Sequence, residues 1–310
     1  MKSGETMRES YITGGKLQPA YVGQPVLNAN LVLEGGAMRG QFTAGVLDYF
    51  MDQGLVFRNV IGTSAGALTG FNYVAGQIGR TSFMNMKYCD DPRYMSMANV
   101  AQYGTALTRE FFFEELPNEL EPFDYHAFAD SPMSLTAVSS NLETGEADYH
   151  RLDEGGSPRD ISYLQATSAI PMFCKIVEVD GKRLLDGGIC DSVPLHYSME
   201  MGTTTKHVVV LTQDATYKKK PNALLPVAQK MYEEYPDFLE RMAYRHFEYN
   251  LTYRRIRRLE EEGRIFVIRP KKPVEVSTME RDADKLFDLY CEGLSCAAES
   301  FDDLRAYLAQ

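Results

Sequence analysis

The apolar residues near the start of the chain follow one arrangement twice: a short apolar run, then glycines, then apolar residues at helical spacing. In the first instance, Leu31–Leu33 predicts a buried strand that leads into a glycine-rich loop at residues 34–40. A helix with one apolar face is predicted next, because apolar residues recur every three or four positions: Phe42, Val46, Leu47 and Phe50. Gly54 stands where such a helix would end.

The second instance, residues 56–67, has the sequence VFRNVIGTSAGA and predicts a strand that turns abruptly into a helix with Ser64 at the turn. Such an elbow strains the backbone of the serine and leaves no room for side chains beside it. Glycine at both Gly62 and Gly66 removes those clashes. The Ser64 hydroxyl would then project from the carboxyl end of the sheet, at the positive end of the following helix dipole.

Later stretches continue the alternation of strands and helices. Strands are predicted at residues 134–140, 147–152, 207–212 and 264–269, with a hairpin around Asp180-Gly181. Helices are predicted within 161–173, ending before Pro171, over about 225–262, and as one or two closing helices over 282–308. This order indicates the α/β class.

Composition narrows the classes of protein that fit. The 310 residues are 44% hydrophobic, which is enough for the core of one large α/β domain or two small ones. A formal net charge of −11 disfavours nucleic acid as a partner, because nucleic-acid binding needs a basic face. The five cysteines include no C-x-x-C pair, and the first 28 residues lack the apolar core of a signal peptide. We therefore expect a cytoplasmic protein with reduced thiols.

The loop EGGAMRG, residues 34–40, joins a strand to a helix, a geometry that gathers free backbone N–H groups around an anion. That anion would be a bound phosphate or the oxyanion of a tetrahedral intermediate. The phosphate interpretation lacks a G-K-[ST] motif, and Ala37 occupies the middle glycine position of the dinucleotide pattern. A tight turn that needs glycine only for steric reasons is an alternative.

Together, the serine elbow and the amide-rich loop supply what acyl transfer requires. A serine attacks a carbonyl, and fixed N–H donors stabilise the developing negative charge; the loss of one donor costs about 10²–10³ in rate. The expected donors are the amide of Ala65, directly after the serine, and the amides of residues 35–40.

A third motif, Asp186-Gly187-Gly188, ends the second strand of the hairpin. An aspartate there can be held against the floor of a site, although an ordinary turn has the same sequence. No histidine lies in a late loop like the histidine-bearing loop of α/β-hydrolases: the five are His126, His150, His196, His207 and His246. An aspartate acting alone as base would need burial without a cation partner to raise its pKa.

Two other stretches have both a functional and an ordinary interpretation. Phe111–Phe113, with Tyr94, Met95 and Met97, could line an apolar acyl channel, although core or lid packing is the commoner reason for such residues. Residues 241–258 hold six arginines against Glu248, a pattern that suits transient contact with an anionic membrane surface. A solvated outer helix is the commoner case, because three glutamates follow at 260–262.

Four motifs, in order, resemble those of the bacterial patatin-like phospholipases: Gly35–Gly40, Gly62–Gly66, Ala166–Pro171 and Asp186–Gly188. The resemblance covers about residues 29–215. It implies a lipid acyl hydrolase with a serine–aspartate dyad and neither metal nor other cofactor, in which Ser64 is the nucleophile and Asp186 its partner. The implied oxyanion hole comprises Gly35, Gly36, Ala37, Arg39, Gly40 and Ala65.

The chain departs from the family pattern at two positions. Ala37 replaces the middle glycine of the loop, which should be tolerated if its φ is negative, because donation is through the backbone. Ser192 stands where many members have asparagine, which leaves a minor polar contact undefined. Residues 216–310 match no family pattern.

We therefore expect a three-layer α/β/α sandwich with a central, mainly parallel sheet. Its expected parts are a flexible arm at 1–28, a catalytic core at 29–215, and a C-terminal extension at 216–310 packed on the same domain. The expected activity is hydrolysis of acyl esters of phospholipids or related lipids. A soluble carboxylesterase or thioesterase with the same dyad and a non-catalytic lipid-binding protein on this fold are alternatives. The sequence does not define the head group, the acyl chain or the oligomeric state.

Overall fold

The computed structural model describes residue 21 and residues 23–310. Most of the predicted N-terminal arm, residues 1–28, lies outside the described residues. The last part of that range begins the first strand, β1, which spans Val26–Leu33 and therefore starts earlier than its apolar core at 31–33.

Described strands form one mixed sheet in the order β5-β6-β3-β2-β1-β7-β8, with β4 paired to β3. Neighbours from β3 to β8 run parallel, whereas β4, β5 and β6 pair antiparallel at the other edge. The strands after β1 span Val56–Thr63 (β2), Ser134–Asn141 (β3), Ala147–Leu152 (β4), Val177–Val179 (β5), Lys182–Asp186 (β6), His207–Val210 (β7) and Phe266–Ile268 (β8). The predicted strands and the Asp180-Gly181 hairpin are confirmed.

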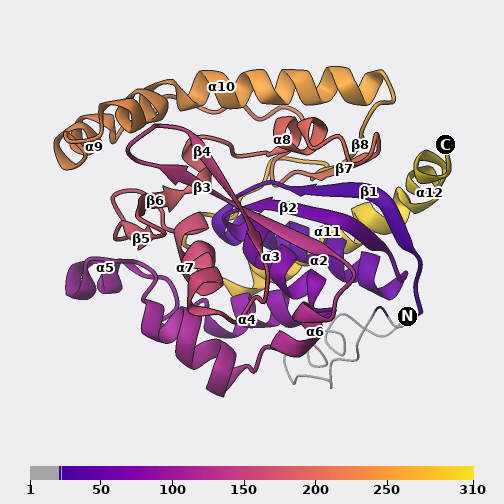
Figure 1. The fold of residues 1–310 in the computed structure, drawn as a ribbon, viewed down its shortest axis with the longest axis horizontal. Helices are drawn as coiled ribbons and strands as arrows, with labels where there is room; N and C mark the ends of the chain where they lie inside the picture. The colour runs from indigo at the N-terminus through magenta and orange to yellow at the C-terminus, as the bar shows by residue number, and fades with distance from the viewer. Residues whose placement is uncertain (1–20, 22) are drawn as a thin grey trace.

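Alternation along the central strands creates two cores, because successive strand residues point to opposite faces. Leu31 and Leu33 belong to the larger apolar cluster, whereas Val32 between them belongs to the smaller one. Helices on the larger side are α2 (Gly40–Asp52), α3 (Ala65–Val74), α4 (Arg80–Tyr88) and α11 (Ala283–Glu299). Helices α8 (Leu195–Glu200) and α10 (Pro236–Glu261) cover the other side (Figure 1). The three-layer α/β/α sandwich with a mainly parallel sheet is confirmed.

Helix α11, from the C-terminal part of the chain, packs directly on α2. A β-carbon at Gly45 would lie 2.2 Å from the Tyr290 carbonyl oxygen, and one at Gly293 would lie 2.2 Å from that of Phe42. Only glycine allows two helix backbones this close. The closing region, predicted as one or two helices, consists of α11 and α12 (Phe301–Ala309).

Two helix predictions need correction. The stretch 225–262 is not one helix but two, α9 (Leu225–Met231) and α10, and Pro236 begins the second where a missing N–H costs nothing. Helix α7 (Pro158–Thr167) ends before Pro171, as predicted, but it begins earlier than residue 161, because the Ser157 side chain accepts the Asp160 amide and Pro158 suits the first helical position. The remaining helices are η1 (Ala37–Arg39), α5 (Met97–Tyr103), η2 (Glu110–Leu120), α6 (Tyr125–Ala129) and η3 (Gly187–Ile189).

Candidate active site

Ser64 lies at the sharp turn between β2 and α3, as predicted. Its φ of +54° and ψ of −126° are a conformation that side-chain-bearing residues rarely adopt. A β-carbon at Gly62 would lie 2.6 Å from the backbone nitrogen of Ala67, and one at Gly66 would lie 2.6 Å from the carbonyl oxygen of Leu33. The two glycines are therefore required by close backbone approach, and the strained turn aims the serine side chain away from the helix.

Asp186 ends β6 and meets Ser64 across the end of the sheet. The Ser64 hydroxyl donates to Asp186 Oδ2 over 2.6 Å, and the Gly188 amide donates to Oδ1 over 2.7 Å. A β-carbon at Gly187 would lie 2.1 Å from the Val138 carbonyl oxygen, so the chain after Asp186 presses against β3. Both carboxylate oxygens of Asp186 are thus held, one by the serine and one by the backbone.

The Ala166–Pro171 segment fixes both residues of this pair. The Thr167 hydroxyl oxygen accepts the Ser64 amide over 2.8 Å and donates its own proton to the Val138 carbonyl. The Ala169 carbonyl accepts the Asp186 amide over 2.9 Å. The third motif of the sequence therefore ties the serine elbow and the aspartate to one short segment.

Burial raises the pKa of Asp186 above its usual range, against four stabilising influences on its anion. The Ser64 hydroxyl and the Gly188 amide lower it through hydrogen bonds, and the positive charges of Arg245 and Lys219 lower it further. Burial was the expected source of a raised pKa and is present, but the condition that no cation lies nearby is not met, because Arg245 and Lys219 oppose the shift. Both cations come from beyond residue 215, where the motifs of the sequence have no counterpart.

Some backbone amides of the 34–40 loop donate hydrogen bonds to carbonyls within the protein, and others do not. The Gly35 amide donates to the Ser192 carbonyl over 3.1 Å, and the Arg39 amide donates to the Gly36 carbonyl over 3.1 Å. The Gly40 amide is also engaged, with the carbonyls of residues 37 and 38. Among the described residues, no hydrogen-bond acceptor takes the amides of Gly36, Ala37 or Ala65. These last three are the available donors to an anion.

The backbone of Ala37 does not have the negative φ that was expected for an alanine at this position. Its φ is +48°, in the left-handed region, rather than negative. An L-residue pays about 1–2 kcal/mol there, which explains why glycine suits this position. The loop nevertheless keeps the turn, and Ser192 contributes its hydroxyl to the Gly188 carbonyl over 2.7 Å in place of an asparagine contact.

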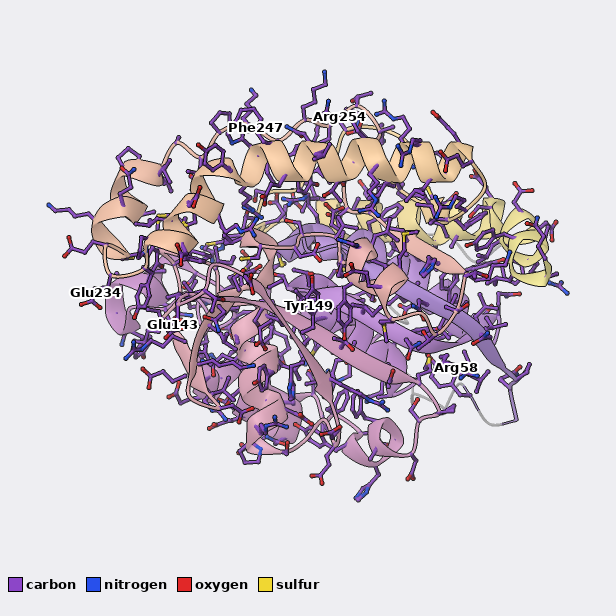
Figure 2. The ribbon with its side chains drawn as sticks, turned by 45° about the horizontal axis from the view of Figure 1, so that its top comes forward. Arg58, Glu143, Tyr149, Glu234, Phe247 and Arg254 are labelled. Atoms are coloured by element: carbon purple, nitrogen blue, oxygen red, sulfur yellow. The ribbon has the colours of Figure 1, made fainter. Side chains whose placement is uncertain are left out.

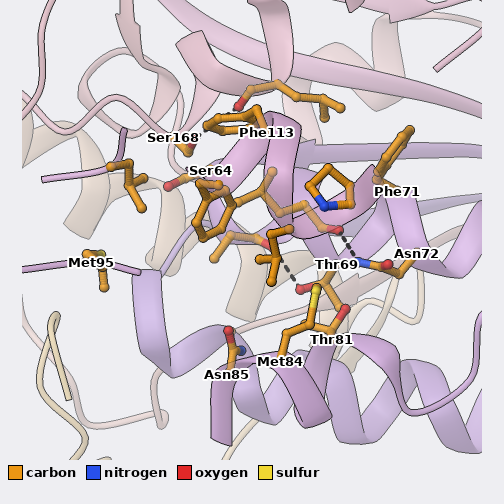
Figure 3. A pocket seen from close by; sticks show the side chains of 18 of the residues that line it. Ser64, Thr69, Phe71, Asn72, Thr81, Met84, Asn85, Met95, Phe113 and Ser168 are labelled. Carbon is orange, nitrogen blue, oxygen red and sulfur yellow. Dashed lines mark hydrogen bonds between the residues drawn. The ribbon is translucent and has the colours of Figure 1, made fainter. Parts of the chain in front are cut away.

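An apolar cavity opens beside Ser64 (Figure 3). Ser64, Phe113, Met95 and Met84 lie around it, and Tyr94 and Phe112 add to its lining. Four of the residues considered for an acyl channel therefore line it, whereas Phe111 is buried nearby and Met97 is 55% exposed. Core packing was the commoner interpretation of these residues. Phe113 is both buried in the core and part of the cavity lining.

Three of the five histidines interact with residues outside the Ser64–Asp186 pair. His150 contacts Asp160 and stacks on Tyr163, His207 contacts the Ser198 hydroxyl, and His196 lies on the surface near Glu200. Among the described residues, none of the five histidines hydrogen-bonds to Ser64 or to Asp186.

Two family models together match most of the chain. Residues 31–199, more than half of it, match the family model for patatin-like phospholipases, and residues 235–309 match a domain of unknown function, DUF6363. YjjU of Escherichia coli K12 is 26% identical over 260 residues, which cover 79% of this chain and 69% of YjjU. The NTE family protein Rv1063c of Mycobacterium tuberculosis H37Rv is 26% identical over 165 residues, which cover 53% of this chain and 44% of that protein. VipD from Legionella pneumophila has a TM-score of 0.42 at 13% identity, over 87% of this chain and 67% of its own.

Across residues 23–310, none of the helices has both the length and the apolar character needed to cross a bilayer.

Proposed function

The chain belongs to the patatin-like phospholipase family, as its motifs predicted, and on this premise we propose that it hydrolyses acyl ester bonds of phospholipids or related lipids. The observation that carries the proposal is the 2.6 Å hydrogen bond from Ser64 to Asp186 at the wall of an apolar cavity. A serine with a buried base beside it is a nucleophile, and a cavity lined by aromatic and methionine side chains accepts a hydrocarbon chain.

In the proposed reaction, Asp186 takes the proton of the Ser64 hydroxyl while Oγ bonds to the acyl carbon. The carbonyl electrons move to oxygen, where the amides of Gly36, Ala37 and Ala65 stabilise the charge. Collapse of this intermediate breaks the ester C–O bond, and the leaving alcohol takes the proton from Asp186. Water then adds to the acyl-enzyme, with Asp186 again as base, and the fatty acid leaves as Ser64 is restored.

We further propose that the substrate is met at a lipid surface. Six large apolar side chains are exposed on α9, its start and α10: Leu224, Val227, Met231, Tyr244, Phe247 and Leu251. In each helix their spacing is i, i+3 and i+7, which places them on one face. Figure 2 shows Phe247 and Arg254 on the outer side of α10, away from the sheet. We name these six residues the outer apolar face; exposed arginines beside it suit an anionic lipid surface.

The α9 part of this face is connected to the candidate active site by one contact. The hydroxyl of Tyr232, directly after α9, accepts the Met172 amide over 2.7 Å, and Met172 follows the cavity-lining Ile170 closely in the chain. A lipid surface held by α9 would therefore present its esters near Ser64. The three-part organisation, with an arm at 1–28, a core at 29–215 and an extension at 216–310, fits this division of roles and is part of the proposal.

The experiment that tests the proposed function is a pair of assays with one acyl ester, below and above its critical micelle concentration. We expect the rate of fatty-acid release to rise sharply above that concentration and to vanish in Ser64→Ala. Smooth saturation below it, without a rise, would favour a soluble carboxylesterase or thioesterase. No release from either form by a folded protein would favour a non-catalytic lipid-binding protein.

A further inference from the structure

The segment 217–222 and helix α10 line a second hollow, of about 340 Å³, which we name the basic hollow. Five basic side chains line it, Lys218, Lys219, Lys220, Arg245 and His246, and the other lining residues are uncharged. With about 30 Å³ for each water molecule in the liquid, the volume admits a phosphate group with several waters. No carboxylate among the lining residues balances this charge.

Among the described residues, no carboxylate forms an ion pair with the cations of the basic hollow. The backbone of Lys219 is fixed on both sides by Asn250, which accepts its amide over 2.9 Å and donates to its carbonyl over 3.0 Å. The Lys219 ammonium lies 4.3 Å from the centre of the Tyr249 ring, and no described carboxylate forms an ion pair with it. By contrast Arg241, about one turn before Arg245, pairs with Glu248 over 2.7 Å.

Arg245 connects the basic hollow to the candidate active site. Its Nε donates to the Gly188 carbonyl, and the amide of the same Gly188 holds Asp186. The other two nitrogens of its guanidinium have no hydrogen-bond partner among the described residues, although the side chain is half-buried. The Nδ1 of His246 is also buried without a partner in the described part of the chain.

The electrostatic balance around Lys219 is unfavourable in the absence of an anion. Burial lowers its pKa to about 7, and the positive charges of Arg245 and Arg39 lower it further. Glu34 and Asp186 are the nearby carboxylates that oppose this. The oxygens of Glu34 already accept the Thr212 amide over 2.6 Å and the hydroxyls of Tyr249 and Tyr253, and those of Asp186 accept the Ser64 hydroxyl and the Gly188 amide. Neither carboxylate forms an ion pair with Lys219 among the described residues. Burying a cation without such a pair is costly, and a bound anion reduces that cost.

We propose that the basic hollow binds a phosphate group, that of the head group of the lipid whose ester lies at Ser64, so that the protein selects phospholipids over neutral acylglycerols. Arg245 presents free donors that match phosphate oxygens, and Lys219 supplies a point charge. The inference rests on the proposed function for its source of phosphate; free phosphate would satisfy the same chemistry.

Calorimetric titration of the Ser64→Ala protein tests the anion site without any turnover. The probes are inorganic phosphate, glycerol 3-phosphate, and neutral-detergent micelles containing either phosphatidylglycerol or diacylglycerol with the same acyl chains. We expect binding of glycerol 3-phosphate and a preference for phosphatidylglycerol micelles over diacylglycerol micelles. Adding Lys219→Gln should weaken both effects about 10- to 100-fold, as expected for a lost charge-assisted hydrogen bond.

Two further variants keep the test decisive. Lys220→Gln, at an exposed lining position, should weaken binding a few-fold without affecting folding. Lys230→Gln makes the same charge change on α9 outside the hollow and should leave every titration unchanged. Phosphate binding without preference for phosphatidylglycerol would overturn the head-group assignment in favour of free phosphate. Absence of anion binding, or equal binding by Lys219→Gln and Lys230→Gln, would overturn the site itself.

The titrations test the anion site independently of the proposed hydrolysis. Because the titrations use Ser64→Ala, they report on the basic hollow even if the wild-type protein cleaves no ester. Conversely, ester cleavage that is equal for phosphatidylglycerol and diacylglycerol would leave the hydrolase proposal standing and contradict the head-group site.

Discussion

As the proposed base, Asp186 has to satisfy two opposing requirements. It must ionise near neutral pH, yet it must also hold a proton long enough to return it to a leaving group. Burial raises its pKa, which favours the second requirement, while hydrogen bonds from Ser64 and Gly188 and the charges of Arg245 and Lys219 favour the first. The acidity of this carboxyl is therefore set by groups on four separate segments of the chain.

Replacing Arg245 tests this balance. Removing a cation disfavours the ionised carboxylate, so Arg245→Gln should raise the pKa of Asp186 and move the acid limb of the kcat/KM profile to higher pH. The profile is measured on a short monomeric ester without phosphate, so that the basic hollow is not engaged. Arg245→Lys, which keeps the charge, should restore the limb toward its wild-type position. An acid limb that stays in place or moves to lower pH in Arg245→Gln would contradict the assignment of Asp186 as base.

Local sequence was sufficient to identify Ser64 and Asp186 as candidates, because their neighbouring glycines are needed within a few residues of each. It was not sufficient for the oxyanion loop. The engagement of the Gly35 amide depends on the carbonyl of Ser192, and the positive φ of Ala37 depends on how the loop closes over β2. The cations near Asp186 were not predicted either, because Lys219 and Arg245 reach the site only through tertiary packing.

At the scale of elements, α10 has two faces with different roles. Its inner face packs Tyr249, Tyr253 and Ile256 into the smaller core, whereas Tyr244, Phe247 and Leu251 are more than half exposed. The sequence indicated the basic charge of this helix, but its exposed apolar residues were not predicted from the sequence. Only the structure separates the buried residues from the exposed ones, because both sets repeat at helical spacing.

The outer apolar face predicts a change in lipid binding. The double variant Phe247→Glu with Leu251→Glu should lower affinity for anionic vesicles at least about 10-fold, because burying each such side chain contributes about 1.5–3 kcal/mol. Hydrolysis of a short monomeric ester should be preserved. Binding is measured by vesicle co-sedimentation, with Leu120→Glu on η2 as the matched control for an apolar-to-acidic change. Equal vesicle binding by the double variant and the control would refute the lipid-surface role of α10.

At the scale of the whole molecule, Asp48 links the first part of the chain to the last. Its carboxylate on α2 accepts the Gly79 amide over 2.9 Å and the hydroxyl of Tyr290 on α11 over 2.9 Å. Burial raises the pKa of Asp48 from 3.8 to about 7, despite these two hydrogen bonds. The folded protein therefore holds this proton more tightly than the unfolded chain does.

This difference predicts a pH-dependent stability. As pH rises from about 4 to about 7, the unfolded chain releases the proton first, so the free energy of unfolding falls by up to about 1.4 kcal/mol per pH unit from this group. Asp48→Asn lacks the titration and should gain stability relative to wild type over that window, as measured by urea unfolding at pH 5 and pH 8. Asp52→Asn, an exposed position on the same helix, should show no such gain. A wild-type advantage over Asp48→Asn that grows with pH would contradict the argument.

The overall architecture followed from the sequence because its strands and helices alternate and its apolar runs are short. The order of the strands in the sheet did not follow, since partners such as β1 and β7, or β3 and β6, lie far apart in the chain. The position of residues 216–310 relative to the sheet could not be predicted from the sequence either. Their helices cover both faces of the sheet, and they bring the cations to a site whose motifs all lie before residue 189.

The central proposal is that Ser64, activated by Asp186 without a histidine, attacks the acyl carbon. The most direct measurement is the rate of covalent labelling by a fluorophosphonate, with the adduct located by peptide mass spectrometry. We predict a single adduct on Ser64, none in Ser64→Ala, and a rate about 10²–10⁴-fold lower in Asp186→Asn, the usual contribution of a general base. Gln at position 126, 150, 196, 207 or 246 should change the rate only a few-fold. An adduct that persists in Ser64→Ala, an unchanged rate in Asp186→Asn, or a folded histidine variant as slow as Asp186→Asn would contradict the claim.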